Sequence, residues 1–158
     1  YAVGKSLVEE SMMEQAKKLV ENPKIIIPET VIVSESPDKA GRVTSADSIK
    51  DTESIFDIAP EALHDLETIV QNAGTILWNG PIGFFEKENF SEGTMKIAEM
   101  IISSKGFSVV GGGDTISAAE KADVIDEIDY VSTAGGAFLE FMEGKKLPAI
   151  DALIEKVN

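Results

Sequence analysis

The order of apolar segments in the second half of the chain is the feature that most restricts its fold. A helix with an apolar stripe begins at Pro60, and from there helices alternate with short apolar runs. Strands are predicted at residues 75–78, 107–110 and 128–131, and further helices at 91–104, 114–122, 136–143 and 147–157. Short apolar strands separated by helices indicate parallel pairing through right-handed crossovers. We therefore expect an α/β protein with an open, doubly wound parallel sheet and helices on both faces.

The first part of the chain has a different pattern. Residues 5–21 carry apolar side chains at a spacing of three to four, which predicts a helix that ends at Asn22-Pro23. Two β-rich runs follow, at residues 24–27 and 31–33. Pro28 separates them, and a central strand tolerates proline badly.

Residues 34–53 are polar, charged and without periodicity, so we expect them to form an exposed excursion. The helix at residues 5–21 has no strand before it, and residue 1 is Tyr rather than Met. An alternating α/β unit normally begins with a strand. Residues 1–158 are therefore expected to form a single partial domain that is incomplete on its N-terminal side.

Composition excludes several classes of protein and site. The 158 residues contain 28 acidic and 14 basic side chains, a net charge of −14, and Arg42 is the single arginine. Binding to nucleic acid or to an anionic membrane needs a basic surface, and none is visible. The chain has no cysteine and one histidine, which excludes thiolate metal sites, a cysteine nucleophile and a His-rich metal site. There is no apolar run near the roughly 18 residues of a membrane span and no leader-like segment.

Glycines gather at three places where a predicted strand passes into the next segment. These junctions are Asn79-Gly80-Pro81-Ile82-Gly83, Gly111-Gly112-Gly113-Asp114-Thr115 and Thr133-Ala134-Gly135-Gly136. In a parallel sheet all three lie at the carboxyl ends of the strands, which is the edge where open α/β sheets bind ligands. Glycine lets the backbone approach an anion, and a following helix offers free N–H groups. Three such clusters would suit a polyphosphate, although βα turns favour glycine in any case.

Individual side chains near these junctions have more than one interpretation. Asp114 is either the N-cap of the next helix or a ligand of Mg²⁺ at phosphates, and one residue can do both. Phe84, Phe85 and Glu86 offer two aromatic rings and a carboxylate for a purine and a ribose, although phenylalanine is more often a core residue. His64 is expected on the surface. Neither GxxxxGK[ST] nor GxGxxG is present.

Several segments, in order along essentially the whole chain, resemble the phosphoglycerate kinase family. Residues 78–86, WNGPIGFFE, resemble the signature WNGPxGxFE, and residues 111–115 match GGGDT/S. Residues 131–137 are similar to VSTGGGA, and residues 139–148 to LExLxGKxLP. Residues 4–7 and 57–60 fit GxSL and DIGP. The resemblance implies the latter part of a Rossmann-like nucleotide-binding domain, without the family's GxKVxDK segment and its domain for 3-phosphoglycerate.

The resemblance also implies roles for single residues. Glu86 would accept hydrogen bonds from the ribose hydroxyls, and Gly80, Ile82 and Phe85 would line the nucleotide slit. Asn79 would lie near the phosphates. A second set would act on the phosphates and the metal. Around the phosphates would lie Gly112, Gly113, Asp114 and Thr115, with Asp114 facing Mg²⁺. The transferring phosphoryl group would accept hydrogen bonds from the amides of Gly135 and Gly136.

The implied activity is reversible phosphoryl transfer between 1,3-bisphosphoglycerate and Mg-ADP, giving 3-phosphoglycerate and Mg-ATP, by a glycolytic, cytoplasmic enzyme that is monomeric at full length. The alternative is a non-catalytic nucleotide- or phosphate-binding α/β module. Two positions depart from the family: Ala134 replaces the usual first glycine of three and Phe138 the usual serine. If position 134 requires a positive φ, alanine costs on the order of 1 kcal/mol there.

Overall fold

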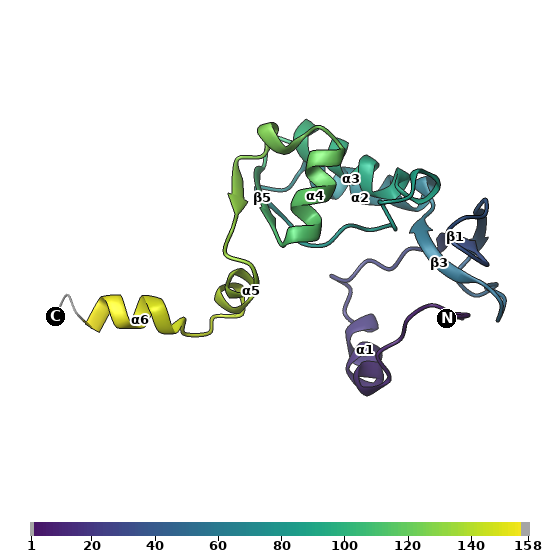
Figure 1. Ribbon diagram of the computed structural model, residues 1–158, viewed down its shortest axis with the longest axis horizontal. Helices are drawn as coiled ribbons and strands as arrows, with labels where there is room; N and C mark the ends of the chain where they lie inside the picture. The colour runs from purple at the N-terminus through teal and green to yellow at the C-terminus, as the bar shows by residue number, and fades with distance from the viewer. Residues whose placement is uncertain (1, 156–158) are drawn as a thin grey trace. The chain divides into compact units, whose positions relative to one another are not determined.

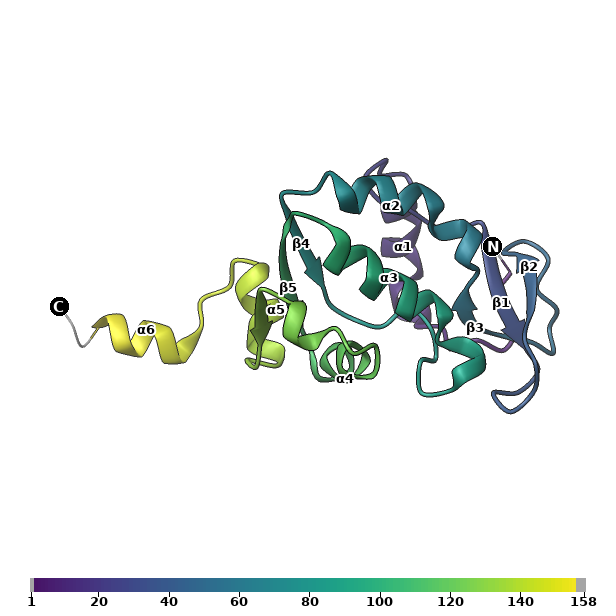
Figure 2. The ribbon, with the colours of Figure 1, turned by 90° about the horizontal axis from the view of Figure 1, so that it is seen from above.

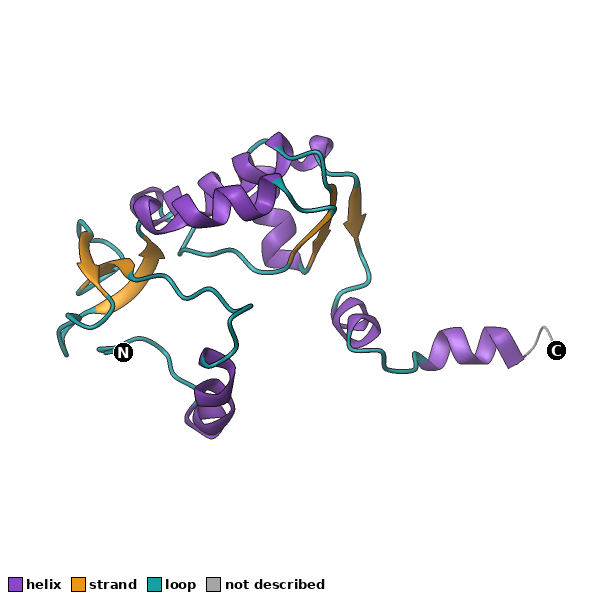
Figure 3. Cartoon of the chain, turned by 180° about the vertical axis from the view of Figure 1, so that it is seen from behind, coloured by secondary structure: helices purple, strands orange, loops and turns teal. Residues whose placement is uncertain are grey.

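The computed structural model describes residues 2–155, and the chain divides into two compact units. Unit 1 comprises Tyr1–Thr68 and Ile82–Lys96, and unit 2 comprises Ile69–Pro81 and Ile97–Asn158. Each unit has its own three-stranded sheet, and Figures 1 and 3 show these two groups of strands.

Unit 1 is built on an antiparallel sheet in the order β2-β1-β3. Its strands are β1 (Thr30–Ser34), β2 (Arg42–Ser45) and β3 (Ser54–Ile58). The β-branched residues of β1 supply the core on both faces of the sheet. Val31 and Val33 pack with Ile49 on one face, and Ile32 packs with Ala59 and Phe90 on the other.

Two expectations for this region are wrong. Residues 24–27 form no strand. The segment 34–53 is not merely an exposed excursion, because it contains β2, where Thr44 is buried, and the buried Ala46 and Ile49. A short strand with polar residues on one side leaves little periodicity in the sequence, and only pairing with β1 reveals it.

The helices of unit 1 begin with η1 (Glu10–Met12) and α1 (Met13–Val20), which confirm a helix within residues 5–21. The next helical segment is η2 (Pro60–Leu63), with Pro60 in its first turn as predicted. It continues as α2 (His64–Gln71). Later in the chain come η3 (Glu88–Phe90) and α3 (Glu92–Ser103). The first residues of α2 and α3 belong to unit 1 and their remaining residues to unit 2.

The segment before α1 is fixed to the strands of unit 1 through the residues that resemble GxSL. The Lys5 N–H donates to the Glu53 carbonyl at 2.7 Å, and the Ile55 N–H donates to the Ser6 hydroxyl at 2.9 Å. Gly4 has a φ of +55° and lies against the same Glu53 carbonyl, where a Cβ would clash. The glycine and the serine of this motif therefore serve packing within unit 1.

Unit 2 contains the parallel sheet that the sequence predicts. Its strands are β4 (Thr75–Trp78), β5 (Phe107–Gly111) and β6 (Tyr130–Ser132), paired in the order β4-β5-β6. The helices of its later part are α4 (Gly113–Lys121), η4 (Ile125–Glu127), α5 (Gly136–Met142) and α6 (Pro148–Glu155). Figure 2 shows β4 and β5 side by side. The predicted α/β class is confirmed.

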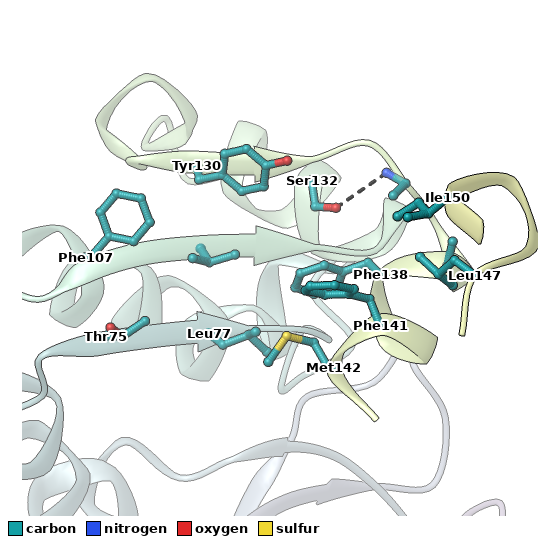
Figure 4. A pocket seen from close by; sticks show the side chains of 13 residues that line it. Thr75, Leu77, Phe107, Tyr130, Ser132, Phe138, Phe141, Met142, Leu147 and Ile150 are labelled. Carbon is teal, nitrogen blue, oxygen red and sulfur yellow. Dashed lines mark hydrogen bonds between the residues drawn. The ribbon is translucent and has the colours of Figure 1, made fainter. Parts of the chain in front are cut away.

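The two faces of the parallel sheet differ in how far they are covered. Each strand is added on the same side of the previous one, and the right-handed crossover from β5 to β6 places α4 on one face. On the other face, α5 contributes Phe138 and Phe141, while Phe107 and Tyr130 remain 51% and 56% exposed. A cavity of about 510 Å³ lies there, lined by β4, β5, β6, α5 and the start of α6 (Figure 4).

Among residues 2–155, no helix is long and apolar enough to cross a membrane.

Candidate functional site

The first two glycine junctions of unit 2 are joined by the buried side chain of Thr115. The Gly80 N–H donates to the Thr115 hydroxyl at 2.7 Å, and Thr115 is 1% exposed. The indole N–H of Trp78 donates to the Gly80 carbonyl at 2.9 Å. The end of β4 is therefore held against the first turn of α4, which follows β5. Thr115 was expected at the phosphates, and its hydroxyl is engaged with the neighbouring junction.

Gly112 is the residue that turns the chain from β5 into α4. It has a φ of +91°, and a Cβ there would lie 2.8 Å from Asn79 Oδ1 and 3.4 Å from Thr115 Oγ1. A side chain would thus be strained and crowded. The structure brings Asn79, Gly80 and Gly112 together, as the position of these junctions at one sheet edge predicts.

Asp114 does not cap α4. The N-cap position is Gly112, and Asp114 lies in the first turn with an exposed side chain. The interpretation of Asp114 as an N-cap is therefore wrong. An acidic residue in the first turn still interacts favourably with the helix dipole, but its carboxylate oxygens are free to meet a cation.

This carboxylate fits the way proteins hold magnesium at phosphates. Mg²⁺ is usually bound through one or two carboxylates together with phosphate oxygens and water, rather than by a cage of protein ligands. Within residues 2–155 no group of three His, Cys, Asp or Glu side chains could hold a metal ion. Asp114 is thus a candidate for a shared metal site in which a bound polyphosphate supplies further oxygens.

The third junction follows β6, which is fixed to β5 by a carboxylate. Asp129 Oδ2 accepts from the Ser108 N–H at 2.7 Å and from the Ser108 hydroxyl at 2.9 Å. These hydrogen bonds hold the pKa of Asp129 below its usual value. Because β5 and β6 are parallel, Gly135 and Gly136 follow β6 at the same sheet edge as Gly112. Both glycines are exposed, with open space where a Cβ would lie.

The two departures from the family pattern, Ala134 and Phe138, have separate structural explanations. Among the described residues other than glycine, Asp123 alone has a positive φ, so position 134 does not require one and Ala134 carries no such cost. Phe138 packs against Gly111, where a Cβ would lie 2.4 Å from its ring. The ring of Phe138 thus occupies the space where a side chain at position 111 would lie.

In unit 1, the remaining candidates lie on the loop before η3. Ile82 is partly buried, Phe85 is 6% exposed, and Glu86 is exposed. Phe84 stacks on Phe56, with ring centroids 6.0 Å apart, and its N–H donates to the Phe56 carbonyl at 2.7 Å. Since the ring of Phe85 is buried, the Glu86 carboxylate is the accessible polar group directly after it. His64 is exposed, as predicted.

Sequence reasoning missed two buried polar residues of unit 1, Asp57 and Thr94. Asp57 belongs to residues 57–60, which resemble the family's DIGP segment, so a signal was present without an indication of its role. Thr94 lies in the predicted helix 91–104 without any distinguishing pattern. Both contact the segment that carries Ile82 and Gly83.

Comparisons with known proteins agree with these motifs. A sequence model described as phosphoglycerate kinase matches residues 1–145. The chain belongs to the phosphoglycerate kinase family. It is 44% identical to phosphoglycerate kinase from Coxiella burnetii, with a TM-score of 0.89 over 96% of this chain and 41% of that one. It is 30% identical to phosphoglycerate kinase from Pyrococcus horikoshii OT3, with a TM-score of 0.78 over 90% of this chain and 36% of that one. The chain therefore spans about two fifths of the length of these kinases.

Proposed function

We propose that this chain supplies the Mg-ADP/ATP-binding part of a phosphoglycerate kinase, and that residues 1–158 correspond to the latter part of the nucleotide-binding domain. The whole enzyme would transfer a phosphoryl group reversibly between 1,3-bisphosphoglycerate and ADP, giving 3-phosphoglycerate and ATP. Family membership supports the reaction, its place in glycolysis and a cytoplasmic location. The acceptor would bind to protein outside this chain.

The observation that carries the proposal is the edge of the parallel sheet in unit 2. Gly80, Gly113, Gly135 and Gly136 have nothing within 4 Å of the position of a Cβ. Gly113 and Gly136 are also the first residues of α4 and α5. Backbone N–H groups at such positions bind anions without cationic side chains, which suits a chain with a net charge of −14.

Each unit has its own part in this proposal. In unit 2, the amides of Gly112 and Gly113 with Asn79 would bind the phosphates, and those of Gly135 and Gly136 the group in transfer. Asp114 would hold Mg²⁺, which when bound neutralises charge on the phosphate oxygens. In unit 1, Glu86 would accept hydrogen bonds from the ribose hydroxyls, beside the backbone of Ile82 and Phe85.

We further propose that the isolated chain does not turn over substrate. Phosphoryl transfer depends on positioning and on positive charge around the transferring group. The single arginine, Arg42, is already bonded to Glu53 in unit 1 through two nitrogens at 2.8 and 2.6 Å. A coupled assay with 3-phosphoglycerate and ATP on material of verified mass tests this, and turnover by the 158-residue chain would contradict it.

The assignment of Asp114 is tested by substituting Asp114→Asn and measuring ADP affinity with and without magnesium. A carboxylate near a polyphosphate is repulsive unless a divalent cation lies between them, so the wild-type chain should prefer Mg-ADP over free ADP. The neutral variant should lose that preference. Because Gly112 holds the N-cap position, we expect the free energy of unfolding to change by no more than about 0.5 kcal/mol. An unchanged magnesium preference would remove Asp114 from the metal site.

A further inference from the structure

The backbone of the loop that carries Glu86 is fixed by a side chain outside the loop. The hydroxyl oxygen of Thr94, in α3, lies within hydrogen-bonding distance of two consecutive amides. It accepts from the Ile82 N–H at 3.2 Å and from the Gly83 N–H at 3.1 Å. The Phe84 N–H donates to the Phe56 carbonyl at 2.7 Å. Three amides in a row are thus bonded to the body of unit 1, and Thr94 holds two of them.

Thr94 is itself held by a second buried polar residue. Asp57, on β3, accepts the Gly93 N–H at 2.9 Å through Oδ2 and the N–H of Ile58 at 2.9 Å through Oδ1. The first of these bonds fixes the N-terminal turn of α3, in which Thr94 is the next residue. Asp57 also lies against the loop, because a Cβ on Gly83 would be 2.3 Å from Asp57 Oδ1.

Burying these two polar side chains lowers the stability of the fold unless hydrogen bonds compensate for it. Asp57 is 1% exposed and Thr94 is 0% exposed, and a buried carboxylate or hydroxyl lowers stability unless it is hydrogen-bonded. Burial raises the pKa of Asp57, against the opposing effect of its two backbone hydrogen bonds. Both residues accept hydrogen bonds from backbone N–H groups, which belong to the loop, to the start of α3 and to β3 itself. The two polar groups therefore specify the path of the backbone.

The path of residues 82–84 decides where the next two side chains lie. Phe85 is buried and only 6% exposed, whereas Glu86 directly after it is exposed. A loop free to rotate at Ile82 and Gly83 would present Glu86 in many directions. Ordering it on binding would then cost affinity, and a loop already held in place avoids that cost.

We propose that Thr94, supported by Asp57, is a positioning residue that holds residues 82–86 in the conformation that binds the nucleoside part of ADP. This inference rests on the proposed function, since it assumes that Glu86 binds the ribose. Thr94 acts through the amides of Ile82 and Gly83 and does not itself touch the nucleotide.

The test compares Thr94→Val, which keeps the shape and removes the hydroxyl, with Thr94→Ser, which keeps the hydroxyl. Hydrogen exchange of the amides in residues 82–86 is measured in the 158-residue chain, together with its affinities for ADP and for pyrophosphate. In Thr94→Val, exchange at Ile82 and Gly83 should rise at least about tenfold and ADP affinity should fall about tenfold. Pyrophosphate affinity should not change, and Thr94→Ser should match the wild type within about twofold.

Thr44→Val is the matched control. Thr44 is also a buried threonine of unit 1, and its hydroxyl donates to the Ser48 carbonyl at 3.5 Å, away from the loop. This variant also removes one buried threonine hydroxyl, and it should leave the hydrogen exchange of residues 82–86 and the affinity for ADP unchanged.

The outcomes separate the inference from the proposed function. If the wild-type chain binds ADP and Thr94→Val binds it equally well, the inference is overturned and the proposed function stands. If the wild-type chain binds no ADP, the proposed function fails for this chain, and the role of Thr94 in nucleotide binding fails with it. If hydrogen exchange of residues 82–86 is unchanged in Thr94→Val, the claim that Thr94 fixes the loop is refuted, whatever the chain binds. Loss of ADP affinity in Thr94→Ser would overturn the inference even if Thr94→Val does not fold.

Discussion

The glycines of unit 1 look like those at the sheet edge of unit 2 in the sequence, but four of the six glycines at that edge have opposite surroundings. In unit 1, a Cβ on Gly4, Gly41, Gly83 or Gly93 would come within 2.5 Å of another atom. In unit 2, Gly80, Gly113, Gly135 and Gly136 have nothing within 4 Å of that position. The first group permits close packing inside the protein. In the second group the backbone lies beside open space, although the Gly80 N–H already donates to the Thr115 hydroxyl. A glycine-rich motif therefore indicates that another group comes close to the backbone there. Only the structure tells whether that group belongs to the protein or leaves room for a ligand.

The largest effect is expected from Gly83→Ala. Its Cβ would lie 2.3 Å from both Asp57 Oδ1 and the Phe90 carbonyl oxygen, so backbone must move. We expect a loss of about 3 kcal/mol or more in the free energy of unfolding, measured with urea. Gly74→Ala is the control, since nothing lies within 4 Å there and its φ is not positive. It should leave stability unchanged or raise it by up to about 1 kcal/mol. Equal stabilities would contradict the crowding around Gly83.

A second prediction compares the two faces of the parallel sheet. Val110 on β5 is fully buried, so Val110→Ala should cost about 2 kcal/mol in the free energy of unfolding. Tyr130 on β6 lines the open face and is 56% exposed, so Tyr130→Thr should change stability by about 0.5 kcal/mol or less. Urea titrations of both variants give the comparison. A large loss in Tyr130→Thr would mean that the open face is covered in solution.

The third prediction separates nucleoside binding in unit 1 from phosphate binding in unit 2. Glu86→Ala should weaken ADP binding at least about tenfold, because a hydrogen bond to a charged group contributes roughly 1.5–3 kcal/mol. It should leave pyrophosphate binding unchanged, and calorimetric titration measures both. The control is Glu88→Ala, which removes another exposed carboxylate nearby and should affect neither ligand. A Glu86→Ala variant that weakens both ligands equally would show a general charge effect instead.

The smallest effect concerns pH and the ion pair of unit 1. Hydrogen bonds from Arg42, opposed by burial and helped by the Lys50 N–H, lower the pKa of Glu53 to about 2 from its usual 4.5. A carboxylate whose pKa is lower in the folded state stabilises the fold above pH 4.5, and this contribution is lost as the pH falls toward 2. The melting temperature should therefore decline over that range, and less steeply in Glu53→Gln. Identical slopes would show that other carboxylates control the acid transition.

The sheet edge of unit 2 is the part of the site that the sequence predicts well. Residues 75–78 are a strand at the predicted bounds, and those of β5 differ by one residue. The three junctions lie at one edge because parallel strands all end there. Strong periodicity and turn glycines suffice for this, since both act over a few residues.

The role of Asp114 within its junction was less predictable. Aspartate after a glycine run suggests a helix cap, but Gly112 takes the N-cap position with a φ of +91°. A shift of two residues in the start of a helix moves a side chain from capping to the first turn. Such a shift depends on contacts of this junction with Asn79 and Gly80, which come from outside the local sequence.

The sequence by itself determined the α/β class, the strands of the parallel sheet and the family, because these follow from local periodicity and from motifs that can be read in order. Tertiary structure alone decided that Arg42–Ser45 is a strand and that Phe85 is buried beside the exposed Glu86. It also decided that Thr94 accepts the amides of the loop and Asp57 the amide of Gly93. The physical reason is that the pairing of this strand and the hydrogen bonds of Thr94 and Gly93 join residues nine or more positions apart. A buried hydroxyl or carboxylate has no signature in the sequence until the backbone N–H groups that it binds are brought to it.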